Sequence, residues 1–313
     1  MPDATPLLPE PALLDYAWLC VTAALAGGVN ALAGGGTLLT FPALFAALGP
    51  ANAVMANGTS TVALAPASFS SAWAYRNELA KEARWLKLLI LPSLIGGVIG
   101  TLLVTRLPDH YFKTLVPWLI LLASILFALQ PLLAKKKVNL APDEIEPQPK
   151  PESFLQLAAI VFFQLLIAIY GGYFGAGIGI LMLTGLGMMG LKNMHEMNAI
   201  KTVLAGCING TSVVIFVSEG KVNWPIALIM MVAAILGGYF AASYGRRLKP
   251  IYIRWFVITM GFVLSAYFFY GQWQKAKEPA EVPAKQEARS DAPVRASACL
   301  EKPWLLLHDR ATT

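Results

Sequence analysis

Two clusters of glycines interrupt apolar stretches of the sequence, and each cluster leads into a short apolar segment. Gly34, Gly35 and Gly36 precede residues 37–48, and Gly175, Gly177 and Gly179 lie at the start of residues 178–190. Glycine lets the backbone leave a helix, and a helix that restarts after such a break exposes unpaired N–H groups, which attract anions. Close helix packing through small residues is the alternative explanation. Because the two clusters occupy matching positions, we expect a discontinuous helix at each.

Lys201 is a second candidate for binding chemistry. It lies about one turn into a long apolar run, where a charged side chain must snorkel, pair or line a wet cavity. Asn198 precedes it by three residues, so the two side chains can share one helix face. A lysine in this position could hold an anion. The alternatives are snorkelling to the headgroups, or pairing with Glu196 or with a neighbouring helix.

Residues 52–76 crowd small polar side chains into one apolar stretch. The group comprises Asn57, Thr59, Ser60, Thr61, Ser68, Ser70 and Ser71. Hydroxyl groups in a helix can bind a ligand, but they also bond back to their own backbone or join neighbouring helices. The sequence leaves both uses open.

Other kinds of site lack their sequence signatures. There are no paired carboxylates in the apolar runs, no GxxxxGK[ST] loop and no HExxH motif, and the three cysteines lie far apart with no CxxC. We therefore expect no enzyme activity, no metal centre and no cofactor.

The composition places these candidates in a lipid bilayer. The chain has 313 residues, of which 57% are apolar and 13% charged, whereas soluble proteins average roughly 45–50% and about 25%. So few charged groups cannot solvate the surface of a protein this apolar. The net charge of +6 comes from short clusters beside apolar runs, which is typical of membrane topology signals and not of nucleic-acid binding.

Eight apolar runs are long enough to cross a bilayer, which takes about 20 helical residues. They lie near residues 12–33, 53–75, 86–105, 112–133, 154–174, 196–217, 224–244 and 252–272. The segments 37–48 and 178–190 are too short to cross alone and are expected to be broken or re-entrant helices. The predicted fold is all-α: a polytopic transmembrane helical bundle with about eight spanning helices and two short ones.

The chain is expected to divide into two repeats, a linker and a tail. We predict a first transmembrane repeat at 1–133, a polar cytoplasmic linker at 134–152, a second repeat at 153–272 and a disordered tail at 273–313. An offset of 141 to 142 residues sets the two glycine clusters opposite one another, and 52–61 opposite 194–203. Matching glycine-interrupted segments in two repeats indicate a secondary transporter with its site between the repeats.

The basic loops favour repeats of inverted topology. Loops 76–87 and 245–254 and the central linker are rich in Lys and Arg, and all three lie inside if each short segment counts as a crossing. If the short segments are re-entrant, the repeats run parallel and one basic loop lies outside.

Three stretches resemble the TauE/SafE family of sulfite exporter-like membrane permeases. They are GGGTLLTFPAL at 34–44, TSTVALAPASFSSAWAYR at 59–76 and AIKTVLAGCINGTSVVIFVSEGKVNW at 199–224, and the resemblance extends over about 18–272. It implies a multi-pass transporter of the bacterial inner membrane that carries a small anion, with sulfite and organosulfonates as the usual substrates. The expected partners are that anion and the lipid bilayer. A coupling ion and the oligomeric state are left open.

The resemblance also implies a substrate site. The residues carried over by matching motif are Gly34, Gly35, Gly36, Thr37, Thr59, Ser60, Gly175, Gly177, Gly179, Lys201 and Asn209. Two opposed helix N-termini would hold the oxyanion, the hydroxyl and amide groups would donate hydrogen bonds, and Lys201 would supply counter-charge. A non-transporting membrane scaffold and an anion channel are the alternative functions.

Overall fold

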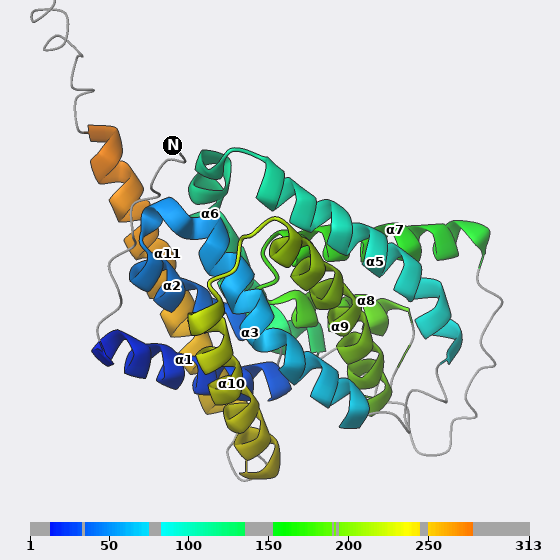
Figure 1. Cartoon of the computed structure of the whole chain (residues 1–313). Helices are drawn as coiled ribbons and strands as arrows, with labels where there is room; N and C mark the ends of the chain where they lie inside the picture. Colours follow the sequence, from blue (N-terminus) through cyan, green and yellow to red (C-terminus); the bar gives the residue numbers. More distant parts are fainter. Residues whose placement is uncertain are drawn as a thin grey trace, which may run out of the picture. The chain divides into compact units, whose positions relative to one another are not determined.

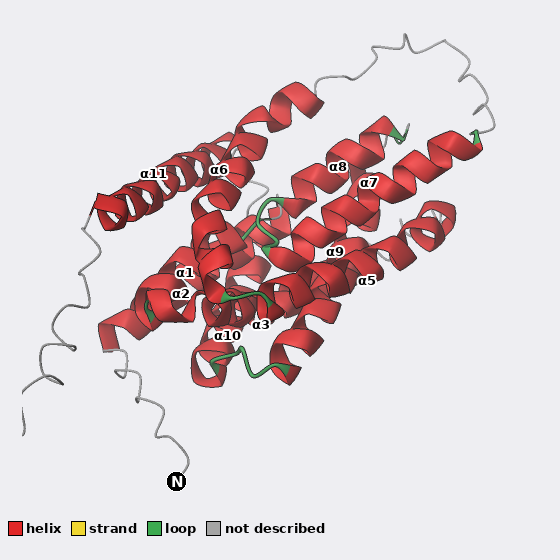
Figure 2. Cartoon of the chain, turned by 90° about the horizontal axis from the view of Figure 1, so that it is seen from above, coloured by secondary structure: helices red, strands yellow, loops and turns green. Residues whose placement is uncertain are grey.

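The computed structural model describes residues 13–32, 35–74, 83–134, 153–189, 191, 194–244 and 250–277, and the regular structure of these residues is entirely helical (Figures 1 and 2). The helices are α1 (Leu13–Leu32), α2 (Thr37–Leu48), a short 3-10 turn η1 (Pro50–Asn52), α3 (Ala53–Ala74), α5 (Ala83–Arg106), α6 (Asp109–Ala134), α7 (Phe154–Tyr173), α8 (Ile178–Met188), α9 (Met194–Ser218), α10 (Trp224–Tyr244) and α11 (Pro250–Lys277).

The predicted all-α class is confirmed, and the helices fall where the apolar runs predict them. Within the described ranges, four of them are long and apolar enough to cross a membrane, namely residues 84–106, 109–129, 154–173 and 196–218. The total of eight crossings stays a prediction. Helix α11 continues to Lys277, so the first residues of the expected tail are helical. Ala134, the first residue of the expected linker 134–152, is the last residue of α6. Residues 135–152 and 278–313 lie outside the described residues.

Large apolar side chains cover the outward faces of the helices. Leu91 on α5 is 63% exposed and Val214 on α9 is 68% exposed, and Trp118, Phe162 and Tyr239 are also exposed on their helices. Apolar surface repeated over so many helices would be unfavourable in water, but it suits contact with lipid. The outward faces therefore agree with a multi-pass membrane protein.

The helices pack in two groups, and each group contains one helix from the other half of the chain. Helix α5 packs against α7 and α9, although it follows α3 in the chain, and α10 packs against α1 and α3. The larger buried core is formed mainly by α1, α2, α3, α6 and α10, with a few residues of α5, α8, α9 and α11 and of the turn before α8, and the other core joins α5 with α7, α8 and α9. Neither group can form from one half of the chain alone.

Small residues let helices of the two halves approach closely. Gly172 on α7 contacts the backbone of Gly97 on α5, and Gly97 also lies against Thr211 on α9. At the same crossing the Thr101 hydroxyl lies within hydrogen-bond distance of the Gly97 carbonyl at 2.8 Å, the Gly172 carbonyl at 3.1 Å and Ser212 Oγ at 2.8 Å. Small side chains and interhelical hydrogen bonds are the usual means of helix association in lipid.

Helices α3 and α9 lie side by side and run antiparallel (Figure 1). Near the start of α3, Gly58 packs against Phe216 in the last turn of α9 and against the carbonyl of Lys221, which follows α9. Further along α3, Ser68 meets Asn209, which is nearer the start of α9. Residues further along α3 therefore contact residues earlier in α9, which is the pattern of an antiparallel pair.

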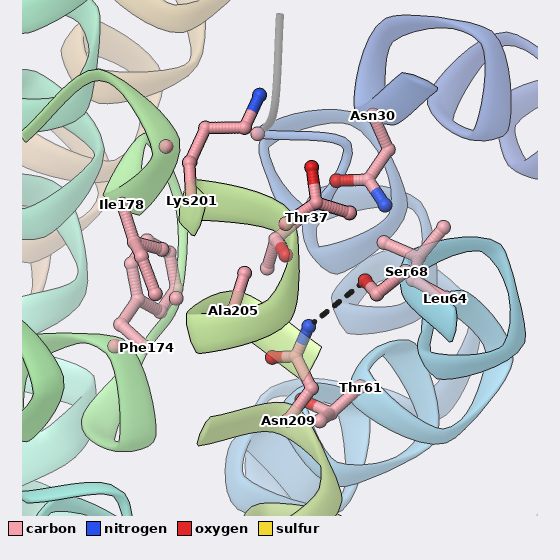
Figure 3. Close-up of a pocket in the computed structure, with 15 residues that line it drawn as sticks. Asn30, Thr37, Thr61, Leu64, Ser68, Phe174, Ile178, Lys201, Ala205 and Asn209 are labelled. Carbon is pink, nitrogen blue, oxygen red and sulfur yellow. Dashed lines mark hydrogen bonds between the residues drawn. The ribbon is translucent and has the colours of Figure 1, made fainter. Parts of the chain in front are cut away.

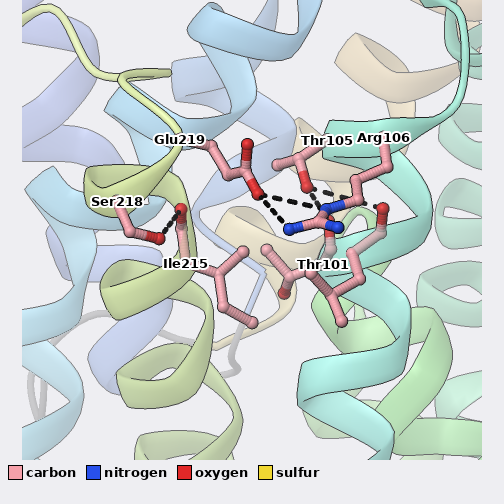
Figure 4. A network of polar contacts seen from close by, with 7 residues as sticks. Thr101, Thr105, Arg106, Ile215, Ser218 and Glu219 are labelled. Carbon is pink, nitrogen blue, oxygen red and sulfur yellow. Dashed lines mark hydrogen bonds and ion pairs between the residues drawn. The ribbon is translucent and has the colours of Figure 1, made fainter.

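An ion pair joins the ends of α5 and α9 (Figure 4). Arg106 Nε and Nη2 both donate to Glu219 Oε1, at 3.2 and 3.0 Å. The Arg106 side chain is 71% exposed and that of Glu219 31% exposed, so water competes with this pair.

The helix starts follow a constant spacing. Helices α1, α2, α3, α5 and α6 begin at 13, 37, 53, 83 and 109, and α7 to α11 begin at 154, 178, 194, 224 and 250, each 141 residues later. This difference sets 53–62 opposite 194–203, one residue away from the alignment of 52–61 with 194–203 that the sequence predicts.

Candidate functional site

The first glycine cluster separates α1 from α2. Gly35 has a φ of +117°, and a side chain at this position would meet the Phe127 ring at 2.6 Å. Only glycine fits both the backbone conformation and the space. Gly36 is the N-cap of α2 and no side chain caps it. The Leu38 and Leu39 N–H groups donate to the Gly35 and Gly36 carbonyls of the turn, so the start of α2 is closed by backbone alone and no side chain shields its positive end.

The second glycine cluster separates α7 from α8 in the same way. Gly175 and Gly177 have φ values of +78° and +75°, and Gly177 is the N-cap of α8, again without a side-chain cap. The Tyr170 hydroxyl fixes the turn by donating to the Ala176 carbonyl at 2.6 Å. Both short helices thus begin at a glycine turn with an uncapped N-terminus.

Aromatic packing and a buried amide hold the second turn against the first half of the chain. The Phe174 ring packs edge-on against Phe41 of α2, with ring centroids 5.2 Å apart, and Asn57 Nδ2 on α3 donates to the Tyr173 carbonyl at 3.0 Å. Edge-to-face aromatic pairs and buried hydrogen bonds both fix geometry.

A cavity of about 50 Å³ lies where the two turns meet α3 and α9 (Figure 3). Its lining residues are Asn30, Gly35, Thr37, Thr61, Leu64, Ser68, Gly171, Phe174, Gly175, Ile178, Gly179, Lys201, Thr202, Ala205 and Asn209. The volume is several times what one water molecule needs. Thr37 and Ile178, the first residues of the two short helices, both belong to the lining, so the two N-termini open into one space.

Lys201 brings a positive charge to this cavity. The residue is 6% exposed, and its Nζ donates to Asn198 Oδ1 at 3.1 Å. The shared helix face of Asn198 and Lys201 is therefore confirmed, and the ammonium lies inside the protein. Uncapped N–H groups and an ammonium are complementary to an anion.

Neutral hydrogen-bonding groups complete the lining. Asn209 Nδ2 on α9 donates to Ser68 Oγ on α3 at 3.2 Å, across the cavity (Figure 3). Thr61 and Thr202 add one hydroxyl from each helix, and each donates to its own helix backbone. Their oxygens stay available as acceptors, while the amide of Asn209 can donate.

The cavity brings together six of the eleven residues that the sequence suggests as a site: Gly35, Thr37, Gly175, Gly179, Lys201 and Asn209. Gly36 and Gly177 flank it as N-caps, and Gly34 lies outside the described residues. Thr59 and Ser60 do not line it: Thr59 Oγ1 accepts a bond from the Asn223 N–H at 2.9 Å, and Ser60 Oγ is hydrogen-bonded to Thr40 Oγ1. The roles proposed for all eleven stay predictions.

Several lining residues are missing from that sequence-based set. Thr61, Leu64 and Ser68 lie three and four residues apart and so form one face of α3, and Lys201, Thr202, Ala205 and Asn209 form the matching face of α9. This periodicity is visible in the sequence, but it does not tell which face turns inward. Within the described ranges, no three His, Cys, Asp or Glu side chains come together to hold a metal ion.

The chain is similar to bacterial proteins named as transporters. It is 28% identical to a probable membrane transporter protein of Haemophilus influenzae, over 79% of this chain and 92% of the relative. It is 26% identical to the probable membrane transporter protein YfcA of Escherichia coli, over 80% and 88%, and 25% identical to ORF9 of a Sinorhizobium species, also named a probable membrane transporter protein, over 76% and 87%. No solved structure matches the chain significantly.

The family comparison agrees with these relatives and covers both glycine turns. The profile named Sulfite exporter TauE/SafE matches residues 19–268, which include every residue that lines the cavity. The relatives are transporters by name, a class distinct from enzymes. The chain is therefore a membrane protein of the sulfite exporter TauE/SafE family.

Proposed function

We propose that this protein is a secondary transporter that moves a small anion through the cavity between α3 and α9 by alternating access. The observation that carries the proposal is the meeting of the buried Lys201 ammonium with two uncapped helix N-termini in one cavity. Each helix N-terminus contributes about half a positive charge. An oxyanion would find its counter-charge and hydrogen-bond donors there without water.

The distribution of lining residues supports a site between two repeats. Five pairs of lining residues differ by 141 positions: Asn30 and Gly171, Thr37 and Ile178, Thr61 and Thr202, Leu64 and Ala205, and Ser68 and Asn209. The same difference separates the helix starts. A cavity lined by equivalent positions of both halves is the arrangement found at the repeat interface of secondary transporters.

The antiparallel pairing of α3 with α9 supports inverted topology of the repeats. Under the 141-residue spacing these two helices are counterparts. Counterparts that lie side by side and point in opposite directions are related by an axis in the membrane plane. On this basis we assign the first repeat to 1–133, the polar linker to 134–152 and the second repeat to 153–272.

The exchange of α5 and α10 between the two helix groups suggests how access alternates. Each group combines helices of one half with one helix of the other, α10 in the first group and α5 in the second, and residues of both groups line the cavity. Rocking of one group against the other would open the cavity to each side in turn while the lining stays the same.

We assign the substrate to the sulfur oxyanions, with sulfite or an organosulfonate first, and the protein to the bacterial inner membrane. The family name supports this substrate class. The three oxygens of a sulfite or sulfonate group match a site that combines two helix N-termini, an ammonium and an amide.

The test is sulfite flux in proteoliposomes that contain the purified protein, compared between wild type, Lys201→Met and Lys113→Met. Lys201→Met removes the charge in the cavity at similar length, and we expect a loss of flux of at least about tenfold, because one charged hydrogen bond contributes roughly 1.5–3 kcal/mol. Lys113 on α6 is outside the cavity, so its variant should transport like wild type.

Three results would contradict the proposal. Equal flux for wild type and Lys201→Met would contradict the assignment of Lys201 to the anion site. Flux that never saturates and shows no counterflow would indicate a channel. Absence of flux for sulfite, thiosulfate, sulfoacetate and acetate, in protein that keeps its thermal stability, would favour a membrane scaffold.

A further inference from the structure

Asn57 on α3 carries a buried oxygen without a partner. The residue is 1% exposed, its Nδ2 donates to the Tyr173 carbonyl at 3.0 Å, and its Oδ1 is the only fully buried side-chain N or O atom of the described residues with no hydrogen bond. A carbonyl can only accept, so the amide orientation is fixed and Oδ1 is the free end. An unsatisfied buried group of this kind calls for a water or an ion.

The second half of the chain fills the corresponding place with a cation. A difference of 141 residues pairs Asn57 with Asn198 and Ser60 with Lys201. Asn198 Oδ1 accepts a hydrogen bond from the Lys201 ammonium at 3.1 Å. The first half therefore has the same asparagine, but a hydroxyl stands where the second half has a positive charge.

Two further neutral oxygens belong to residues close to Asn57 in the fold, one turn along α3 and on the adjoining α2. Ser60 and Thr40 are both 0% exposed, and Ser60 Oγ lies 2.5 Å from Thr40 Oγ1. The Thr40 hydroxyl is 3.3 Å from the Gly36 carbonyl and can donate to it, in which case Ser60 donates to Thr40. The remaining lone pairs of Ser60 and the free Asn57 Oδ1 are then acceptors on one face of α3, because three residues separate them.

We propose that Asn57 Oδ1, with the hydroxyl oxygens of Ser60 and Thr40, binds Na⁺, which occupies in the first half the position that the Lys201 ammonium occupies in the second. All these oxygens are neutral, which suits a singly charged cation, and oxygen atoms beside interrupted helices are the usual Na⁺ ligands of secondary transporters. The inference rests on the proposed function, since it makes Na⁺ the coupling ion of anion transport.

The first experiment measures thermal stability of the purified protein in NaCl, KCl or choline chloride at equal concentration, so that chloride and ionic strength stay constant. A ligand that binds only the folded state raises the melting temperature in a saturable way. We expect such a rise with NaCl alone. An equal rise with KCl, or none with NaCl, would overturn the proposal, and the second result would mean that Asn57 Oδ1 binds water only.

Two variants and one control test the ligands. Asn57→Ala should abolish the Na⁺ response, and Ser60→Ala should raise the Na⁺ concentration for half the response by about tenfold, as expected for loss of one ligand. Ser124→Ala removes a buried hydroxyl that bonds only within α6 and should respond like wild type. If Asn57→Ala does not fold, the Ser60→Ala response decides the assignment, and an unchanged half-response concentration overturns it.

The second experiment separates this inference from the proposed function. Sulfite flux is measured in proteoliposomes with Na⁺ or choline outside. Flux that needs Na⁺ supports the site, whereas equal flux in both solutions overturns the inference and leaves the anion transporter standing. Absence of flux under both conditions would count against the proposed function itself and not against Na⁺ binding, which the melting temperature reports independently.

Discussion

Asn209 donates a hydrogen bond of 3.2 Å to Ser68, and the two residues are 141 positions apart in the chain, the same spacing that separates the starts of the helices. Two positions that the 141-residue spacing pairs thus contact one another directly. The bond also crosses the cavity, so the point where the halves meet coincides with the candidate site.

This hydrogen bond should be measurable as a coupling energy. Ser68→Ala and Asn209→Ala are each expected to lower the free energy of unfolding by about 0.5–1 kcal/mol, as is usual for hydrogen bonds between membrane helices. The double variant should lose less than the sum, because both changes remove the same bond. Unfolding of all four proteins in mixed micelles checks this, and strict additivity would mean that the bond does not contribute.

Thr37 is expected to contribute to anion binding. It is the first residue of α2 and lines the cavity, so Thr37→Val removes a hydroxyl and keeps the shape of the side chain. Loss of one hydrogen bond, about 1–1.4 kcal/mol, should weaken sulfite binding about five- to tenfold. The measurement is the sulfite dependence of the melting temperature.

Thr22→Val is the matched control for Thr37→Val. Thr22 is buried on α1 and bonds only to the carbonyls of Trp18 and Leu19, and it does not line the cavity. Sulfite affinity should stay at the wild-type value in this variant. Equal weakening in both variants would show that a general loss of packing, and not the cavity hydroxyl, is responsible.

The crossing of α5 and α7 should not tolerate a side chain. A Cβ at Gly172 would lie 2.4 Å from the Gly97 carbonyl oxygen, and backbone cannot move aside cheaply. We expect Gly172→Ala to destabilise the protein by about 1–3 kcal/mol, the usual cost of overpacking. Gly271→Ala on α11 meets no atom within 4 Å and should leave thermal stability unchanged or slightly raised. Equal melting temperatures of both variants would contradict the close approach.

Much of the fold follows from hydropathy, because the bilayer demands long apolar helices. The expected short segment 37–48 is the observed α2, and residues 224–244 are the observed α10. The packing of α5 with the second half and of α10 with the first cannot be predicted from the sequence, because no local pattern encodes which helices become neighbours. Gln164 on α7 illustrates this: it donates to Ser93 of α5 at 2.8 Å, a contact set by packing alone.

The site could be predicted in part, for a similar reason. Gly35 and Gly175 carry backbone requirements that a sequence reveals, and Lys201 is conspicuous as a charge in an apolar run. Ser68 and Thr59 are chemically alike in the same helix, and only the packing of α3 turns Ser68 to the cavity and Thr59 to the loop at Asn223. Residue type alone therefore does not tell which side of α3 faces the cavity.

The Arg106–Glu219 pair is expected to contribute little to stability. Exposed ion pairs usually contribute under about 1 kcal/mol and are screened by salt, and the Arg106 side chain is 71% exposed. Arg106→Glu should therefore lower the melting temperature by only a few degrees at low salt, and the swap with Glu219→Arg should restore it. A swap that fails to restore stability would show that other contacts of these side chains matter more.

The uncapped starts of α2 and α8 make much of the positive potential in the cavity a property of the main chain. A side-chain substitution does not remove the peptide N–H groups, and a high pH does not neutralise them. Any Lys201 variant therefore keeps the attraction of the two helix N-termini for an anion. The protein thus holds a permanent electropositive scaffold, on which a single side chain adjusts strength and selectivity while the glycine turns preserve the rest.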